Sequence, residues 1–95
     1  MPKLYEYLGI AIYFWSNEHN PIHVHGEYGD DICRADIYLF NGKLLRIVFS
    51  GKLEGGKQKD FEKFVRAHID DIVNKWGEFF LKRKHIQPEI VTKKI

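Results

Sequence analysis

The chain has 95 residues, 44% of them hydrophobic and 29% charged, with a formal net charge of +2. This composition is typical of one globular domain with a modest core, and no apolar run reaches the length of about 18 residues that a membrane-spanning helix needs. The single cysteine, Cys33, excludes an internal disulfide and favours a cytoplasmic location, and we expect no signal peptide.

Charge is distributed unevenly along the chain. Residues 1–40 hold two basic and six acidic residues, whereas the rest of the chain holds thirteen basic and seven acidic ones. This asymmetry favours an acidic partner for the basic half or self-association of unlike surfaces into a homodimer. Ordinary solvated surface charge gives the same pattern, so the charges alone do not decide between these possibilities.

Apolar and alternating runs predict four strands, at about residues 9–15, 22–28, 32–40 and 43–49. The first run is nearly all apolar and is expected to be buried on both faces of a sheet. The next two alternate strictly between apolar and polar residues, which indicates one buried face and one solvated face.

Residues 60–83 repeat apolar side chains with the period of an amphipathic helix, and Pro88 makes residues 86–95 an extended tail. The predicted fold is α+β in a single domain, residues 1–95. It is a four-stranded antiparallel β-meander with one long C-terminal amphipathic helix packed on one face. The apolar tail is expected to add to an open sheet edge, either of its own chain or of a second copy.

The hairpin loops set which polar side chains face one another. With Gly29-Asp30 as a two-residue loop, His25 lies opposite Arg34 and His23 lies opposite Asp36. The second hairpin is ambiguous. A two-residue Asn41-Gly42 loop would put Arg46 in the core and the apolar residues Leu45, Ile47 and Phe49 on the solvated face. The hydrophobic pattern therefore favours a three-residue loop, Phe40-Asn41-Gly42, with Arg46 opposite Asp36.

This row of polar side chains is the predicted catalytic site, made of His23, Asp36, Arg46, His25 and Arg34. Asp36 would fix the tautomer of His23 and raise its basicity, while Arg34 or Arg46 would hold a phosphate and stabilise its charge. The predicted binding residues include Tyr38 on the same face and Lys82, Arg83 and Lys84 at the basic end of the helix. A polar sheet face of paired charges without function fits the same pattern.

A divalent metal site is the competing interpretation. His23 and His25 share a strand face, and His19 in the preceding turn supplies a third nitrogen ligand of a kind that zinc, nickel or iron accepts. The opposed Arg34 would repel a cation, however, so we expect no cofactor and keep this ligand set as an alternative.

The histidine-rich stretch EHNPIHVHGEYG, from Glu18 to Gly29, resembles the signature of the small bacterial domain-of-unknown-function family DUF4160. The opening MPKLYEYLGI and the segment HIDDIVNKW carry the same resemblance, although family members usually have a second proline where this chain has Ile22. The resemblance implies a bacterial cytoplasmic protein whose gene lies beside that of another small protein, in a suggested toxin–antitoxin pairing. It also marks His19, Asn20, His23, His25 and Tyr28 as signature positions.

The leading functional hypothesis is a toxin-like member of a toxin–antitoxin pair that acts on nucleic acid through the His/Asp/Arg face. If the protein is an enzyme, the expected reaction is a metal-independent, nuclease-like phosphoryl transfer. The alternatives are a non-catalytic protein–protein interaction module, which docks a small protein encoded nearby, and a small metal-binding protein. No membrane partner is expected.

Overall fold

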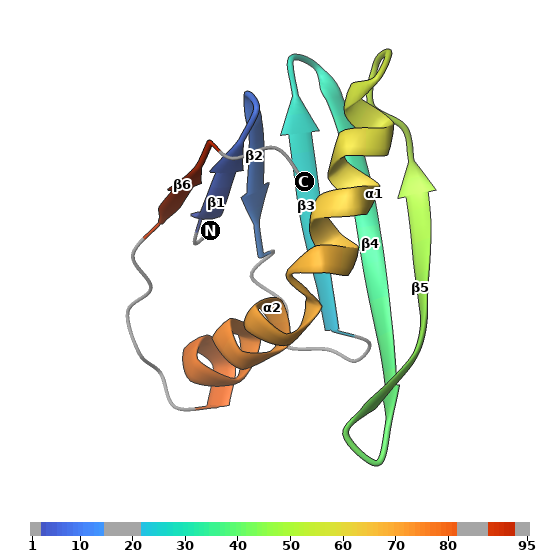
Figure 1. Cartoon of the computed structure of the whole chain (residues 1–95), viewed down its shortest axis with the longest axis vertical. Helices are drawn as coiled ribbons and strands as arrows, with labels where there is room; N and C mark the ends of the chain where they lie inside the picture. The colour runs from blue at the N-terminus through green and yellow to red at the C-terminus, as the bar shows by residue number, and fades with distance from the viewer. Residues whose placement is uncertain (1–2, 15–21, 82–87, 93–95) are drawn as a thin grey trace.

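A computed structural model describes residues 3–14, 22–81 and 88–92, and within them the chain forms a mixed sheet with two short α-helices across one face (Figure 1). The strands are β1 (Lys3–Tyr7), β2 (Ile10–Tyr13), β3 (Ile22–Tyr28), β4 (Asp31–Phe40), β5 (Lys43–Gly51) and β6 (Glu89–Val91). The helices are α1 (Lys57–Ala67) and α2 (Ile69–Trp76), followed by a π-helical turn at Gly77–Leu81. The sheet has six strands in the order β5-β4-β3-β2-β1-β6.

The prediction of a four-stranded antiparallel sheet is wrong at both ends of the chain. The predicted strand 9–15 is only half of an N-terminal hairpin, in which β1 pairs with β2. Leu8 and Gly9 form its turn, both with positive φ, at 49° and 83°. A leucine seldom adopts positive φ, so the sequence carries no recognisable turn signal at this point.

The C-terminal segment supplies the sixth strand. Residues Glu89–Val91 pair in parallel with β1 of the same chain, Glu89 opposite Tyr5 and Val91 opposite Tyr7. The extended tail therefore adds to a sheet edge, as expected, and it makes the sheet mixed instead of antiparallel. Residues 86–87 and 93–95 of the predicted tail lie outside the described residues.

The prediction of one long helix over residues 60–83 is also wrong. The helix begins earlier, with Gly56 as its N-cap, and it bends at His68, where φ is −109° and ψ is 21°. Helical hydrogen bonds continue across the bend, from His68 N to Phe64 O and from Ile72 N to His68 O. The apolar repeat therefore runs through it unbroken, and the bend turns α2 away from α1 toward the β1–β2 side of the sheet (Figure 1).

The core lies between the sheet and the helices. Buried side chains from β1 to β4 meet Phe61, Phe64, Val65 and Ile72 of the helices. Gly26 on β3 lies directly beneath Phe61, and a Cβ at position 26 would come within 2.6 Å of the Phe61 ring. The absence of a side chain at this position therefore allows the close approach of α1 to the sheet.

Candidate functional site

The predicted pairing of the histidine strand with its neighbour is confirmed. In the β3–β4 ladder, His23 lies opposite Asp36 and His25 lies opposite Arg34. Gly29 has the positive φ expected of the two-residue hairpin loop that sets this register. We refer to Tyr13, His23, His25, Arg34 and Asp36 as the histidine cluster, since β2 adds Tyr13 directly opposite His25.

The histidines are not on a wet face, which corrects the sequence prediction. The exposed fraction is 5% for His23 and 1% for His25, because β3 is covered on both faces from Ile22 to Gly26. The Tyr13 ring stacks on His25 at 5.9 Å between centroids, and the His23 ring meets it edge-on at 5.8 Å. A substrate as large as a nucleic acid would have to displace these contacts to reach either imidazole.

Burial also sets the charge state of the cluster. It lowers the pKa of His25 to about 4, helped by the nearby His23 and Arg34 and opposed by Asp36. Burial likewise raises the pKa of Tyr13 to about 12, together with the hydrogen bond that its hydroxyl donates to Glu27 Oε2 at 2.8 Å. Near neutral pH, His25 is therefore an uncharged imidazole and Tyr13 an uncharged phenol.

The predicted phosphate-binding arginines lie apart. Arg34 Nε donates to Asp36 Oδ1 at 2.5 Å, so the guanidinium is already neutralised by a carboxylate of its own strand. Arg46 lies opposite Tyr38, not Asp36, and its guanidinium carbon is 5.0 Å from the Tyr38 ring centre. Asp36 instead lies opposite Val48.

The second hairpin explains the misplacement of Arg46. Its loop is the two-residue Asn41-Gly42 turn, with both φ values positive at 52° and 76°, and not the three-residue loop that the pattern favoured. Leu39 pairs with Leu44 and Tyr38 pairs with Arg46, so Leu45 is an extra residue in a β-bulge. After the bulge, the later apolar residues of β5 again face the core. The two-residue loop is therefore compatible with the hydrophobic pattern.

Several predicted binding residues do not join the cluster. Tyr28 is half-buried at the far end of β3, where the Lys57 ammonium lies 5.0 Å from its ring centre. Tyr38 is half-buried beneath Arg46. The other five lie outside the described residues: His19, Asn20, Lys82, Arg83 and Lys84.

The metal-binding alternative is untested for the same reason. Within residues 3–14, 22–81 and 88–92, no three His, Cys, Asp or Glu side chains are grouped so that they could hold a metal ion. The set His19, His23 and His25 includes one residue outside these ranges, and Arg34 stands opposite His25, where it would disfavour a cation.

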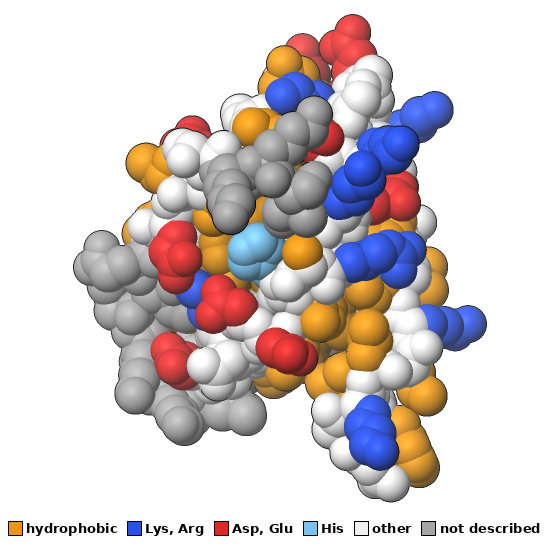
Figure 2. All heavy atoms as spheres, viewed as in Figure 1, with side chains coloured by type: hydrophobic (Ala, Val, Ile, Leu, Met, Phe, Trp, Pro, Cys, Tyr) orange, Lys and Arg blue, Asp and Glu red, His pale blue; other side chains and the backbone are white. Residues whose placement is uncertain are grey.

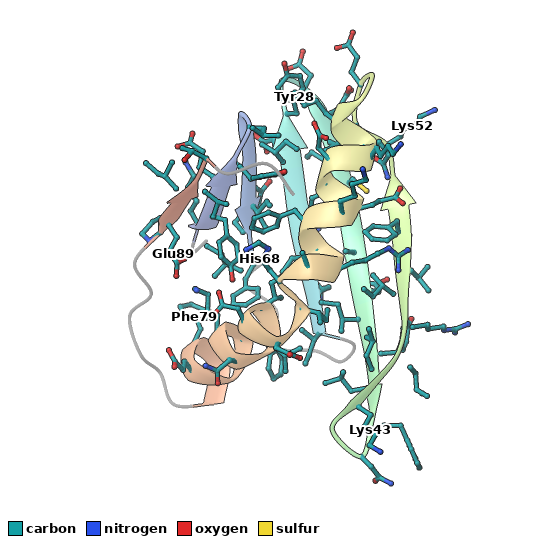
Figure 3. The ribbon with its side chains drawn as sticks, in the orientation of Figure 1. Tyr28, Lys43, Lys52, His68, Phe79 and Glu89 are labelled. Carbon is teal, nitrogen blue, oxygen red and sulfur yellow. The ribbon has the colours of Figure 1, made fainter. Side chains whose placement is uncertain are left out.

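A second polar cluster was missed by the sequence reasoning. Lys75 on α2 donates from Nζ to Asp71 Oδ2 at 2.6 Å and to Glu89 Oε1 at 2.7 Å. The hydroxyl of Tyr5 donates to the same Asp71 oxygen, and Lys75 Nζ lies 4.7 Å from the Tyr5 ring centre. This lysine cluster joins β1, α2 and β6, and Figure 3 shows Glu89 on the side of its strand that faces α2.

The sequence contained part of the signal for the lysine cluster. Asp71 and Lys75 have the i,i+4 spacing of a helical ion pair. Nothing in their spacing indicates Tyr5 or Glu89. Tyr5 lies on β1, a strand that was not predicted, and the sequence did not say which sheet edge the tail that carries Glu89 would join. The burial of Lys75, at 9% exposure, is likewise a consequence of the tail strand that packs beside it.

The third notable region is the open edge of the sheet. β5 pairs with β4 on one side, and no described strand pairs with its other side. Large apolar side chains are exposed along it and beside its turn: Phe40, Leu44, Leu45 and Val48. Figure 2 shows hydrophobic side chains at the lower right of the molecule, where the β4–β5 turn lies, with basic side chains beside them. Within the described residues, no helix is long and apolar enough to cross a membrane.

The class of protein that this arrangement defines is a small α+β domain with two buried histidines, His23 and His25, in a mixed sheet. A family model for a domain of unknown function, DUF4160, matches residues 9–77. The chain therefore belongs to this family, as its histidine signature implied. No curated protein and no solved structure matches the chain.

Proposed function

We propose that this protein is a protein–protein interaction domain that binds an extended segment of a partner at β5. The observation that carries the proposal is the open edge, where the nine residues of β5 pair with a described strand on one side only. Such an edge offers unpaired backbone N–H and C=O groups, which an added strand satisfies. Leu45, with 66% of its surface exposed, and Phe40, with 63%, supply apolar contact area beside it.

The polar groups inside the domain support the same choice. His23 and His25 are buried, and Lys75 is bound by two carboxylates, so none of these groups is open to a large substrate. In this proposal the partner is a small protein encoded by a neighbouring gene, which is what the family resemblance implies.

The test is amide hydrogen exchange of the protein alone and with the product of the neighbouring gene. We expect slower exchange at residues 43–51 in the complex and unchanged exchange in β2. A photo-crosslinker at Leu45 should capture the partner, whereas one at Ile90, which is 73% exposed at the opposite edge, should not. Protection confined to β3 or to β6, or equal capture at both positions, would contradict binding at β5.

The nuclease-like toxin remains the second candidate, and one observation favours it. The β3–β4 register places His23 opposite Asp36, with the Arg34 guanidinium bound to that carboxylate. This candidate requires growth arrest on induced expression and RNA cleavage by purified protein without metal. His23→Ala must abolish both effects while the variant stays folded. If expression of intact protein leaves growth unaffected, the toxin hypothesis fails and the interaction domain is untouched.

A further inference from the structure

Basic side chains border the open edge of the sheet. They come from β5, from the residue after it and from α1, and all are exposed: Lys43, Arg46, Lys52, Lys59, Lys63 and Arg66. We call these six residues the basic edge. Figure 2 shows basic side chains in a column along the right side of the molecule, and Figure 3 places Lys43 and Lys52 near the two ends of β5.

Two arginines of the basic edge flank β5 from opposite faces of the sheet. Arg66 reaches from α1 over the Phe49 ring, with its guanidinium carbon 5.4 Å from the ring centre. Arg46 lies over Tyr38 on the face away from the helices. A strand that added to β5 would therefore meet a guanidinium on each of its own faces, at alternating side-chain positions.

The charge of the basic edge is not cancelled within the described residues. The ion pairs found there involve Lys3, Arg34 and Lys75, and none involves a member of the basic edge. Glu62 on α1 is an acidic neighbour that keeps its charge when it accepts a hydrogen bond from the neutral amide of Gln58 at 2.8 Å. Among the ion pairs of the described residues, none joins Glu62 to the basic edge. The positive charge along β5 is therefore available to a partner.

We propose that the segment which adds to β5 is acidic, an extended stretch of a partner protein that alternates apolar residues with aspartate or glutamate. This inference rests on the proposed function and names the chemistry of the partner. A second copy of this chain is disfavoured at this edge, because pairing β5 with β5 would bring two basic edges together. A nucleic acid would match the charge, but it would leave the backbone groups of β5 unpaired and the exposed leucines without apolar contacts.

The probe is a short capped peptide that alternates valine with glutamate, matched by one of equal length that alternates valine with lysine. Amide exchange of the protein is measured with each peptide and with a single-stranded RNA oligonucleotide. We expect the acidic peptide to slow exchange at residues 43–51 and to bind about tenfold more tightly than the basic peptide, with affinity falling as salt rises. The Arg46→Glu/Arg66→Glu variant should reverse this preference, and Lys3→Glu at the other end of the sheet should leave it unchanged.

The outcomes show whether the acidic partner fails alone or strand addition at β5 fails with it. Protection of β5 by both peptides with equal affinity overturns the acidic partner and leaves strand addition standing. Absence of β5 protection with either peptide overturns both. Tighter binding of the RNA than of the acidic peptide assigns the basic edge to nucleic acid and overturns the inference. Protection of β5 that grows with protein concentration alone assigns the edge to a second copy and overturns it as well.

Discussion

The histidine cluster and the lysine cluster bury titratable groups in two different ways. In the histidine cluster, His25 is buried as a neutral imidazole, and burial lowers its pKa to about 4. In the lysine cluster the charge is kept. Burial alone would lower the pKa of Lys75, yet its hydrogen bonds to Asp71 and Glu89 hold the pKa above the usual value. His25 therefore avoids a buried charge, whereas Lys75 keeps its charge and two carboxylates compensate it.

The two clusters therefore lose their contributions to stability over different ranges of pH. The pKa of Asp71 is held below its usual value, since hydrogen bonds from Lys75 and Tyr5 outweigh its burial. The lysine cluster thus keeps its full contribution to stability between the ordinary pKa of a carboxyl and that of a lysine. His25, whose folded pKa is depressed, contributes fully only above its unfolded pKa of about 6.5, and this contribution falls as the pH drops toward 4.

Acid should produce the largest effect, and it should act on the histidine cluster. Between pH 7 and pH 4 we expect His25 to remove up to about 3 kcal/mol of unfolding free energy, because the unfolded chain takes up a proton that the folded chain excludes. Urea unfolding followed by tryptophan fluorescence over this range measures the loss. His25→Gln should flatten the pH dependence, whereas His68→Gln should retain it. Equal pH slopes for the wild type and His25→Gln would show that His25 is not buried as a neutral group.

A smaller effect is expected from removing the cation of the lysine cluster. Lys75→Met leaves the Asp71 and Glu89 carboxylates near each other without a positive charge. Their side chains are 45% and 57% exposed, so we expect a loss of about 2 kcal/mol, below the 3–5 kcal/mol of a wholly buried pair. Amide exchange at residues 89–91 should accelerate, since Glu89 loses its anchor on α2.

The control for this variant is Lys59→Met, which changes an exposed lysine on α1 and should alter stability by less than about 0.5 kcal/mol. If Lys75→Met is as stable as this control, the ion pairs of the lysine cluster contribute nothing to the attachment of β6.

The smallest effect should follow Asp36→Asn. This change leaves Arg34 partly exposed and hydrated, so we expect a loss of stability no greater than about 1 kcal/mol. The pKa of His25 should fall further, because Asp36 is the group that raises it. An NMR titration of the imidazole signals measures this direction, and Asp30→Asn in the exposed turn is the matched control. A rise in the pKa of His25 would mean that Arg34 moves away when its carboxylate is lost.

The β3–β4 hairpin could be predicted from sequence because its signals are local. The strict alternation of IHVHGEY and the Gly29-Asp30 loop together fix which residues face each other, and β3 has the predicted bounds. The bend at His68 and the turn at Leu8 could not be predicted, because one leaves the helical repeat intact and the other uses a leucine at positive φ. The bulge at Leu45 inserts one residue into β5, so the residue opposite Arg46 was predicted wrongly.

The burial of the histidines is the part of the candidate site that alternation could not give. Alternation with a period of two residues predicts which side chains share a face of the sheet. It does not predict whether other parts of the molecule cover that face. Tyr13, which stacks on His25, belongs to β2, a strand whose bounds were predicted wrongly, so this contact could not be foreseen. The lysine cluster was missed for a related reason, since Glu89 comes from a strand that pairs in parallel across the whole chain length.

Gly26, the glycine of the HVHG stretch, has a consequence for how related sequences can vary. The Phe61 ring occupies the space that a Cβ at position 26 would need, so the residues at positions 26 and 61 are coupled. A family member with alanine at position 26 should carry a smaller side chain than phenylalanine at position 61. The combination of alanine at position 26 with phenylalanine at position 61 should be rare. Retention of this glycine beside His25 in an alignment would then record the distance between a helix and a sheet, and would say nothing of what the histidines do.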